Sequence, residues 1–483
     1  MALTAIIILP LLAALLCWLP PVRKAAWQIT VFFQATEFLL ALAIGAEVIS
    51  HGRAVSAAGW LEADGLGALV ILAVSFVCGV AAVFAGGYMQ QREHEKGRLW
   101  WFYANYNLLV FSLLAVPALA DPNLVWVAVE LVTLFAVLLV GYESSAPAFE
   151  AAWKFSVLTI MGAPIALLGF LTLFWAYHSG AATGHETWET LRLAAPSMSP
   201  ALLRLSFLLV LVGFGTKAGL APMHTWLPDA HSQAPTPVCA VLSGVKTTVP
   251  LYVILRLLGI VLGSPQARMG RWMEVTGLIS VAVAAFLLLQ VRDYKRMFAY
   301  STVEHMGIIL TAAGMATEKS DFGSVFQLLN HSVTKSLCFL VAGIVLLALN
   351  TREIKSVRGL LKISPFAGVT LVFCSLAIAG APPFPIFLSE FSILSSGFRA
   401  GHSAVVGVLA VLIVVAFVGI LMHVNRMVFG RPERAAIAAA RVLPLSCRVA
   451  VLVAVLPVLF LGVYIPPPLH HLLQLAAMQL GGR

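Results

Sequence analysis

The chain has 483 residues, of which 60% are hydrophobic and 11% are charged, and its formal net charge at pH 7 is +9. About a quarter of the residues of a soluble protein are charged, so this composition excludes a disordered or collagenous chain and argues against an ordinary soluble enzyme. The six cysteines are scattered through apolar sequence without a Cys-x-x-Cys motif, which gives no basis for a disulfide framework, a zinc site or an iron–sulfur cluster. We therefore predict a polytopic membrane protein.

Fourteen apolar segments are long enough to cross a bilayer as helices, which takes about 20 residues each. Between charged interruptions they lie near residues 2–19, 26–50, 65–88, 100–120, 123–142, 153–178, 201–221, 237–262, 272–290, 297–316, 322–349, 366–396, 402–427 and 444–465. The predicted fold class is an all-α membrane protein with about fourteen transmembrane helices.

Positive charges are distributed unevenly between the loops. Odd-numbered loops contain more than twice as many Lys and Arg residues as even-numbered loops. By the positive-inside rule the odd-numbered loops are cytoplasmic and both termini lie outside. The first segment is followed, not preceded, by basic residues, Arg23 and Lys24, so it lacks the pattern of a cleavable signal peptide. Topology thus accounts for the net charge: we expect a bacterial cytoplasmic (inner) membrane as the environment and no nucleic-acid partner.

No water-soluble domain stands out between the segments. The longest polar insertion, residues 179–200, contains no catalytic constellation, and the chain has no Gly-rich phosphate loop, no His-Glu-x-x-His and no Gly-x-Ser-x-Gly motif. We expect no catalytic residue, no metal and no cofactor on this chain, so its function should lie within the membrane.

Several ionisable side chains lie inside the apolar segments. Such a group at the bilayer centre costs about 2.5–3.5 kcal/mol on insertion scales, so each requires a partner or a function. The residues are Glu130, Lys217, Lys246, Glu304, His305, His331, Lys335 and Glu390. His331 and Lys335 are four residues apart and so share one helix face.

Each of these residues also has a purely structural interpretation. Glu130 and Lys217 fit the two halves of a static ion pair, His305 fits a hydrogen-bonded packing residue, and Glu304 fits a contact with a neighbouring helix. Glu37, in the second segment, is interpreted as structural or as a rim residue.

The order of residue types along the chain favours function. An acid, two lysines, a histidine with a lysine, and a second acid occur on five separate segments. Burial disfavours the charged form of every such group, so a line of them can exchange protons near neutral pH. We predict a path for protons or cations.

Two segments contain helix-breaking sequence. The seventh includes Pro222 shortly after Lys217, and the twelfth includes Pro382 and Pro383. Because proline removes a helical hydrogen bond and clashes with the preceding turn, both helices should be interrupted near the middle of the membrane. Transporters hold ions at the backbone groups freed by such breaks.

The two broken segments also resemble each other. AGLAPMHTWLPDA and AGAPPFPIFLSEF align without gaps, and the matched pairs include Gly219 with Gly380, Pro222 with Pro383, Leu227 with Leu388 and Asp229 with Glu390. A fainter echo relates Val129-Glu130 to Val303-Glu304. Both offsets are five segments, and an odd offset gives the two copies opposite topology, the inverted-repeat design of many transporters.

Three stretches of sequence carry a family resemblance. TKAGLAPMHTWLPDAHSQAPTPV, DYKRMFAYSTVEHMG and APPFPIFLSEF closely resemble the proton-conducting, antiporter-like membrane subunits of respiratory complex I, cation/proton antiporters and membrane-bound hydrogenases. The resemblance covers about segments 3 to 13. Glu304-His305, where complex I subunits usually have Ser-His, and the motif Asn-His-Ser-x-Thr-Lys are most similar to the hydrogenase-4 component F branch, found in formate-hydrogenlyase-type complexes.

The resemblance implies a fold of fourteen helices with two inverted five-helix repeats and broken helices 7 and 12. It divides the chain into helices 1–3 (residues 1–95), a first repeat (96–263), a second repeat (264–430) and helix 14 with a tail (431–483). One departure is Pro385-Ile386, where the family often has Pro-Gly, and it affects the expected geometry of the second break.

The resemblance also implies roles for the residues that match the family motifs. The implied roles are an ion pair of Glu130 with Lys217, a link between half-channels at Lys246, a central relay of His305, His331 and Lys335, and a terminal group at Glu390.

The function implied is that of a proton-translocating subunit in a redox-driven complex, either a group 4 membrane-bound hydrogenase of the formate-hydrogenlyase type or a complex I-like oxidoreductase. The implied partners are other membrane subunits and a peripheral redox arm, which carries a hydrogenase or a dehydrogenase. Two alternatives stay open: a subunit of a multisubunit Na⁺/H⁺ antiporter, for which the same residues serve equally well, and a non-conducting scaffold for the redox arm.

Overall fold

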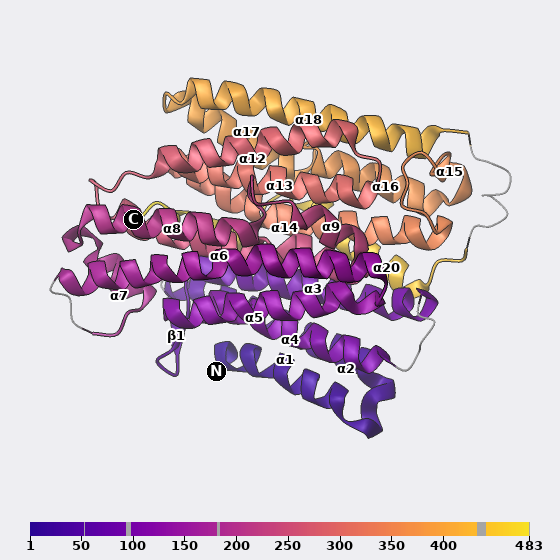
Figure 1. Ribbon diagram of the computed structural model, residues 1–483, viewed down its shortest axis with the longest axis horizontal. Helices are drawn as coiled ribbons and strands as arrows, with labels where there is room; N and C mark the ends of the chain where they lie inside the picture. Colours follow the sequence, from indigo (N-terminus) through magenta and orange to yellow (C-terminus); the bar gives the residue numbers. More distant parts are fainter. Residues whose placement is uncertain (53, 93–97, 181–183, 432–440, 483) are drawn as a thin grey trace.

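The computed structural model describes residues 1–482 apart from 53, 93–97, 181–183 and 432–440. Long helices run side by side along one axis and form a single bundle (Figure 1). Within the described ranges, ten helices are long and apolar enough to cross a membrane, and three shorter apolar helices accompany them. The prediction of a multi-pass, mostly helical membrane protein is confirmed, although a two-stranded hairpin departs from the all-α prediction. The number of fourteen transmembrane helices stays a prediction.

The first part of the chain forms the lower side of the bundle in Figure 1 and includes a small β-hairpin. Its elements are α1 (Ala2–Trp18), the 3₁₀ helix η1 (Pro20–Ala25), α2 (Ala26–His51), β1 (Val55–Ala57), β2 (Leu61–Ala63), α3 (Gly65–Arg92), α4 (Leu99–Ala118), α5 (Pro122–Val140), η3 (Gly141–Glu143) and α6 (Ala146–Ser179). Side-chain caps define where two of these helices begin, because Asp121 and Ser145 accept from backbone amides in the first turns of α5 and α6.

The middle of the chain contains the first interrupted helix. Its elements are α7 (Trp188–Ala194), η4 (Ala195–Ser197), α8 (Pro200–Ala218), α9 (Trp226–Gln233), α10 (Thr236–Val241), the π-helix η5 (Leu242–Lys246), α11 (Thr248–Leu262), α12 (Gly270–Gln290) and α13 (Tyr294–Gly314). The π-helical turn was not predicted from the sequence. It ends at Lys246, and such turns inside helices often mark functional sites.

The last part of the chain contains the second interrupted helix. Its elements are α14 (Glu318–Leu349), α15 (Leu360–Ile363), α16 (Pro365–Ile378), α17 (Pro385–Arg399), α18 (Ser403–Phe429), α20 (Leu445–Phe460) and α21 (Pro467–Leu480). A capping box at Thr317 and Ser320 begins α14.

The two interruptions have the same backbone form. Between α8 and α9 lies Pro222, and between α16 and α17 lie Pro382 and Pro383. Each interruption opens with a glycine in the left-handed region, Gly219 with φ 78° and Gly380 with φ 76°. Glycine adopts this conformation without the steric strain that a Cβ atom imposes, which explains why both helices end at a glycine.

The helix α21 differs from the tail expected after residue 465. Leu472, Leu473, Ala476 and Leu480 are buried, and this spacing of three to four residues gives the helix one apolar face. That face packs on the ends of α3 and α14, and a Cβ atom on Gly65 would lie 2.7 Å from Leu475. At 14 residues the helix is too short to have been recognised as a span.

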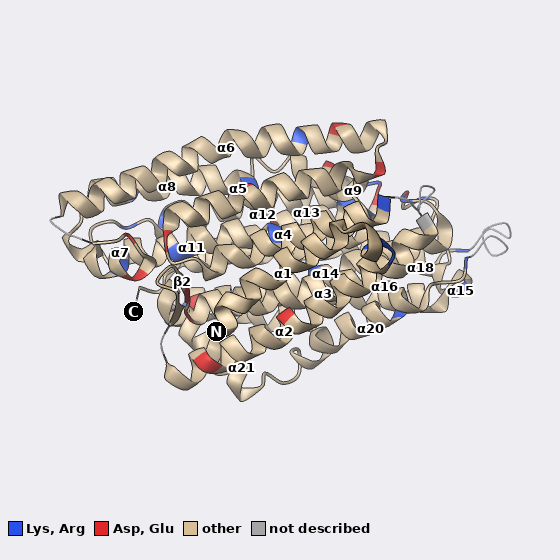
Figure 2. Ribbon diagram, turned by 90° about the horizontal axis from the view of Figure 1, so that it is seen from below, with Lys and Arg blue, Asp and Glu red and all other residues tan. Residues whose placement is uncertain are grey.

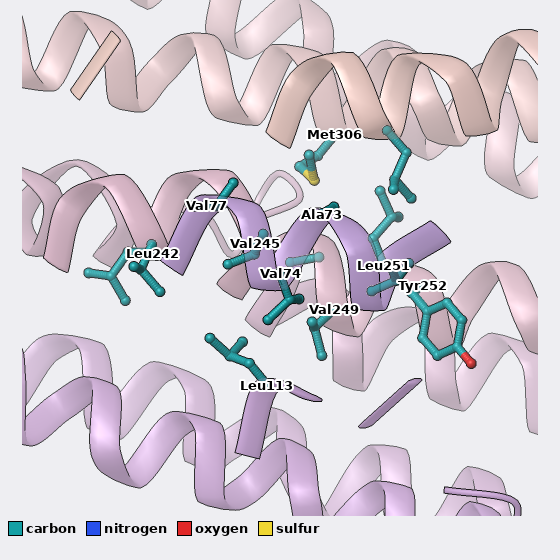
Figure 3. Packing of buried hydrophobic residues seen from close by; sticks show 14 of the residues in the cluster. Ala73, Val74, Val77, Leu113, Leu242, Val245, Val249, Leu251, Tyr252 and Met306 are labelled. Carbon is teal, nitrogen blue, oxygen red and sulfur yellow. The ribbon is translucent and has the colours of Figure 1, made fainter. Parts of the chain in front are cut away.

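The centre of the bundle is formed by α10, η5, α11 and α14. The most apolar stretch of α10–α11 is entirely buried, and that of α14 is 94% buried. Around them, aliphatic side chains from α3, η5 and α11 pack closely, including Val74, Val77, Val245 and Val249 (Figure 3). Any charge placed along this axis therefore lies in a tightly packed apolar environment.

The two ends of the bundle differ in charge. Figure 2 shows Lys and Arg gathered at the end where α9 and α15 lie, which we call the basic end, and few charged residues along the middle of the bundle. The β-hairpin and α7 lie at the opposite end, toward which both chain termini also lie (Figure 1).

Candidate ion pathway

The first group of buried ionisable residues lies where α8 ends. Lys217 occupies the last turn of α8, and its Nζ donates to Oε2 of Glu130 at 3.0 Å and to the hydroxyl of Thr133 at 3.0 Å. Glu130 and Thr133 lie one turn apart on α5. The lysine side chain is 1% exposed and the glutamate side chain 24% exposed, so the acid forms the outer half of the pair.

Lys246 lies next to this pair, at the end of the π-helical turn. Its Nζ donates to the backbone carbonyl of Lys217 at 3.0 Å and lies 4.0 Å from the ring centroid of Trp226 and 4.5 Å from that of Phe155. That carbonyl is at the C-terminal end of a half-helix, where the helix dipole favours positive charge. Cation–π contacts add to this stabilisation when the cation is removed from water.

The middle of the bundle holds two histidines from different helices. His331 of α14 has its Nε2 3.1 Å from the backbone carbonyl of Ser243, in the same π-helical turn that ends at Lys246. The ring of His305 of α13 lies 5.4 Å from the ring of His331, centroid to centroid. The hydroxyls of Ser243 and Thr302 are 2.6 Å apart and join η5 to α13.

Lys335 lies one helical turn beyond His331 on α14. Its Nζ donates to the carbonyl of Phe298 at 2.7 Å and to the hydroxyl of Ser301. The carboxylate of Glu304 lies within electrostatic range of this lysine, and Glu304 is only 4% exposed. Glu304, for which the sequence suggests a contact with a neighbouring helix, thus lies beside the central residues.

The series ends at the second interruption. The Nδ1 of His305 accepts from the amide of Gln327 at 2.8 Å, and its Nε2 donates to the carbonyl of Ile378 at 3.1 Å. The amide oxygen of Gln327 accepts from the hydroxyl of Ser389. Glu390 lies next to Gln327, and an added Cβ on Gly380 would lie 2.3 Å from its carboxylate oxygen.

The structure brings some of the predicted residues into direct contact and joins others only through an intervening side chain. Glu130, Lys217 and Lys246 are linked by direct hydrogen bonds, and His305 contacts His331 ring to ring. His305 and Glu390 approach each other through the amide of Gln327. Pro222, Pro382 and Pro383 lie in the interruptions, whose freed carbonyls at Lys217 and Ile378 each accept a hydrogen bond from a buried ionisable side chain.

Sequence reasoning missed the neutral polar partners and one buried ion pair. The sequence gives no sign of a role for Thr133, Ser243 and Gln327, because their contacts with the ionisable residues form only when the helices pack. Arg256 of α11 pairs with Asp64, which also caps α3 by accepting from the amide of Gly67 at 2.8 Å. The single arginine in the apolar run 248–262 is the sequence feature from which a buried ion pair could have been predicted.

Metal-binding geometry is absent from the part of the chain that the structure describes: no group of three or more His, Cys, Asp and Glu side chains there could hold a metal ion. The six cysteines are buried, free thiols. What the arrangement provides is a row of protonatable groups with hydrogen-bonding neighbours, which is suited to moving protons.

A bundle of apolar helices with two interrupted members and a buried row of acids, lysines and histidines defines an antiporter-like membrane protein. The family model described as NADH:quinone oxidoreductase/Mrp antiporter, transmembrane region, matches residues 121–417, which include every residue of the row. The hydrogenase-4 component F homologue of Methylacidiphilum infernorum (isolate V4) is 35% identical over 378 residues, covering 77% of this chain and 79% of the relative. The chain belongs to the NADH:quinone oxidoreductase/Mrp antiporter family, as its motifs predicted.

Solved structures share the same fold. A subunit of an archaeal membrane-bound sulfane sulfur reductase, a respiratory membrane complex, has a TM-score of 0.88 at 24% identity, covering 99% of this chain and 97% of that subunit. A subunit of the Mrp complex from Dietzia sp. DQ12-45-1b also has a TM-score of 0.88, at 20% identity and the same coverage of both chains.

Proposed function

We propose that this chain is the proton-translocating membrane subunit of a redox-driven complex, either a group 4 membrane-bound hydrogenase of the formate-hydrogenlyase type or a complex I-like oxidoreductase. The observation that carries the proposal is the buried row from Glu130 to Glu390, in which hydrogen bonds and close ring contacts join α5, α8, η5, α14, α13 and α17. The relative described as a hydrogenase-4 component F homologue supports the hydrogenase branch.

The topology that accompanies this function has fourteen membrane crossings. Residues 96–263 and 264–430 are two inverted five-helix repeats, preceded by helices in 1–95 and followed by residues 431–483. The matched glycines and prolines of the two interruptions support the repeat. The basic end faces the cytoplasm of a bacterial cell, and both termini face outward from the cytoplasmic membrane, in keeping with the positive-inside rule.

Proton movement begins at the Glu130–Lys217 pair. Two unit charges 3.0 Å apart attract by on the order of 5 kcal/mol at an effective dielectric constant of about 20. At the same dielectric constant, a unit charge about 6 Å away in a neighbouring subunit interacts with either partner by about 3 kcal/mol, so a charge change there can weaken the pair substantially. The 24% exposed side chain of Glu130 is the part that a neighbouring subunit would reach.

Opening the pair changes the proton affinity of Lys217 and drives protons onward. Lys246 passes protons to the central group of His331 and Lys335, and His305 and Gln327 connect that group to Glu390. No redox cofactor sits on this chain in the proposed mechanism: electron transfer takes place in a peripheral hydrogenase or dehydrogenase arm, and other membrane subunits transmit its effect.

A Na⁺/H⁺ antiporter subunit is the second candidate, and the fold shared with the Mrp complex favours it. A non-conducting scaffold is disfavoured because every position of the row is occupied by an ionisable residue.

The test is proton flux through the assembled complex. The complex is purified through a tag on this chain and reconstituted into liposomes, and proton entry under a potassium diffusion potential is followed with an internal pH dye. Glu130→Gln and Lys217→Met should abolish flux, whereas Lys362→Met, at an exposed position, should not. Undiminished flux in an assembled Lys217→Met complex would contradict the proposal. Sodium-dependent flux would favour the antiporter, and mass spectrometry of co-purified subunits would identify a redox arm.

A further inference from the structure

The basic end of the bundle contains a cavity of about 680 Å³ that lies outside the row described above. It is bounded by the turn after α12, the segment between α14 and α15, and the last turns of α18 with the residues that follow. Five exposed basic side chains line it: Arg292, Lys355, Arg358, Arg426 and Arg431. Among the described residues, no acid contributes to its wall. We call this space the basic cavity.

The wall of the basic cavity is held together by packing and hydrogen bonds. The Nε of Arg358 donates to the carbonyl of Lys355 at 3.2 Å, which fixes the arginine stem on its own segment. Gly430 packs against this stem, since an added Cβ there would lie 3.2 Å from the Cβ of Arg358. His423, which is 6% exposed, has its Nε2 3.0 Å from the carbonyl of Leu288 and so joins α18 to α12. The three sides of the cavity therefore have a defined arrangement.

The cations of the basic cavity lack the acidic partners that their neighbours have. At the same end of the bundle, Arg296 pairs with Asp229 and Arg352 pairs with Asp293. In the part of the chain that the structure describes, none of the five cavity residues forms such a pair. Glu353, the acid nearest to them along the chain, instead accepts from a neighbouring serine hydroxyl at 3.2 Å. Because like charges around one cavity repel, an anion bound there would be stabilised by all of them.

The position of the cavity matches the headgroup layer of a bilayer. It lies where two apolar helices end, α12 at Gln290 and α18 at Phe429. The headgroup layer begins at the boundary of the hydrocarbon core, and basic pockets between membrane helices at this level are suited to lipid phosphates. Four of the five cations are arginines, and a guanidinium group can donate two parallel hydrogen bonds to one phosphate.

An apolar strip on α18 leads directly to the basic cavity. Val411, Val414 and Val418 are 64%, 61% and 52% exposed, and their spacing of three to four residues places them on one face of the helix. Two further steps of four residues along this face reach Arg426, in the cavity wall. Only a third of the most apolar stretch of α18 is buried. An acyl chain can therefore lie along this face while its phosphate occupies the cavity.

We propose that the basic cavity binds the phosphate group of an anionic phospholipid from the surrounding membrane, with an acyl chain along the exposed face of α18. A soluble anion would use the arginines but not the valine strip, whereas a phospholipid uses both. The site is independent of proton movement, because none of its residues belongs to the row from Glu130 to Glu390.

The test maps where a lipid contacts the assembled complex. The complex is reconstituted into phosphatidylcholine nanodiscs with a trace of phosphatidylglycerol that carries a photoactivatable diazirine on its acyl chain, and labelled peptides are identified by mass spectrometry. We expect label on the strip from Val411 to Val418. A basic residue near a membrane surface contributes about fivefold to the binding of an anionic lipid, so Arg358→Gln with Arg426→Gln should reduce this label about 25-fold.

A matched control is Lys362→Gln, since Lys362 is an exposed lysine of α15 at the same end but does not line the cavity; it should keep full labelling. A phosphatidylcholine probe with the same diazirine chain should label the strip at least tenfold less, because it has no net negative charge. Equal labelling by the two probes, or by the double variant, would overturn the proposal. So would displacement of the label by millimolar inorganic phosphate, which would indicate a soluble anion, or cross-linking of α18 to another subunit in place of lipid.

Discussion

The interruption between α8 and α9 and the interruption between α16 and α17 share their backbone form but hold different chemistry. At the first, Lys217 forms an ion pair with Glu130, and Lys246 bonds the freed carbonyl. At the second, the freed carbonyl of Ile378 bonds His305, and Glu390 lies beside the amide of Gln327 with a second acid, Glu304, within electrostatic range. Among the described residues no Lys, Arg or His forms an ion pair with Glu390.

We infer from this difference that the two interruptions have different tasks. An ion pair responds to an outside charge, because its opening changes the proton affinity of both partners. An acid without a cationic partner can store or release a proton without the separation of two opposite buried charges. The first interruption is therefore suited to sensing a charge in a neighbouring subunit, and the second to releasing protons.

The largest effect is expected at the ion pair. Lys217→Met leaves the Glu130 carboxylate without its cation, which destabilises a buried pair by about 3–5 kcal/mol. We expect poor assembly, measured by native gel electrophoresis, together with a fall in flux of about 100-fold. The double variant Glu130→Gln with Lys217→Met should restore assembly but not flux. If the double variant assembled no better than the single one, the pair would not be the source of the defect.

The second interruption should respond differently to loss of its acid. Glu390→Gln removes a protonatable group but breaks no ion pair, so we expect a fall in flux of about 100-fold with normal assembly. Glu390→Asp should retain part of the flux because it keeps the carboxyl group. Poor assembly of Glu390→Gln would mean that the two interruptions are not distinguished by their ion pairing.

Much of this contrast could be predicted from the sequence. Apolar length located the helices, Pro222 and Pro383 located the breaks, and the cost of burying charge singled out Glu130, Lys217 and Glu390. These features are local in sequence or follow from the chemistry of one residue, so they can be predicted from the amino-acid sequence alone.

The remaining features depend on helix packing between distant parts of the chain. Gln327 joins His305 to Ser389 across 22 and 62 residues of sequence, and nothing near it signals that role. The π-helical turn before Lys246 and the surface helix α21 arise from side chains that meet only in the folded bundle.

A smaller effect is expected from the glycines that open the two interruptions. Alanine at either position should destabilise the backbone by about 1 kcal/mol, since both have φ near 77°. At Gly380 the new methyl group would also displace the carboxylate of Glu390, whereas at Gly219 it would meet a methyl group of Leu227 at 2.4 Å. Because a misplacement of about 1 Å can slow a reaction by up to roughly 100-fold, we expect Gly380→Ala to lower flux about tenfold and Gly219→Ala less than about twofold. Equal flux in the two variants would show that the position of Glu390 is unimportant.

The smallest effect is expected at an aromatic position that the two interruptions do not share. Trp226 stacks under the ammonium of Lys246 at 4.0 Å and donates to the carbonyl of Thr216 at 2.8 Å, while the aligned residue after the second interruption, Phe387, stacks on Phe391. Trp226→Phe keeps a ring but removes the N–H donor and weakens a cation–π contact worth about 0.5–2 kcal/mol.

Since 1.4 kcal/mol corresponds to a factor of ten, Trp226→Phe should change flux by about two- to fivefold. Phe387→Leu, measured under the same potential, should leave flux unchanged because no cation lies against that ring among the described side chains. An equal loss in both variants would mean that the aromatic residues act only through packing. A loss confined to Trp226→Phe would show that the ring under Lys246 contributes to proton movement at the first interruption and that the matching ring at the second does not.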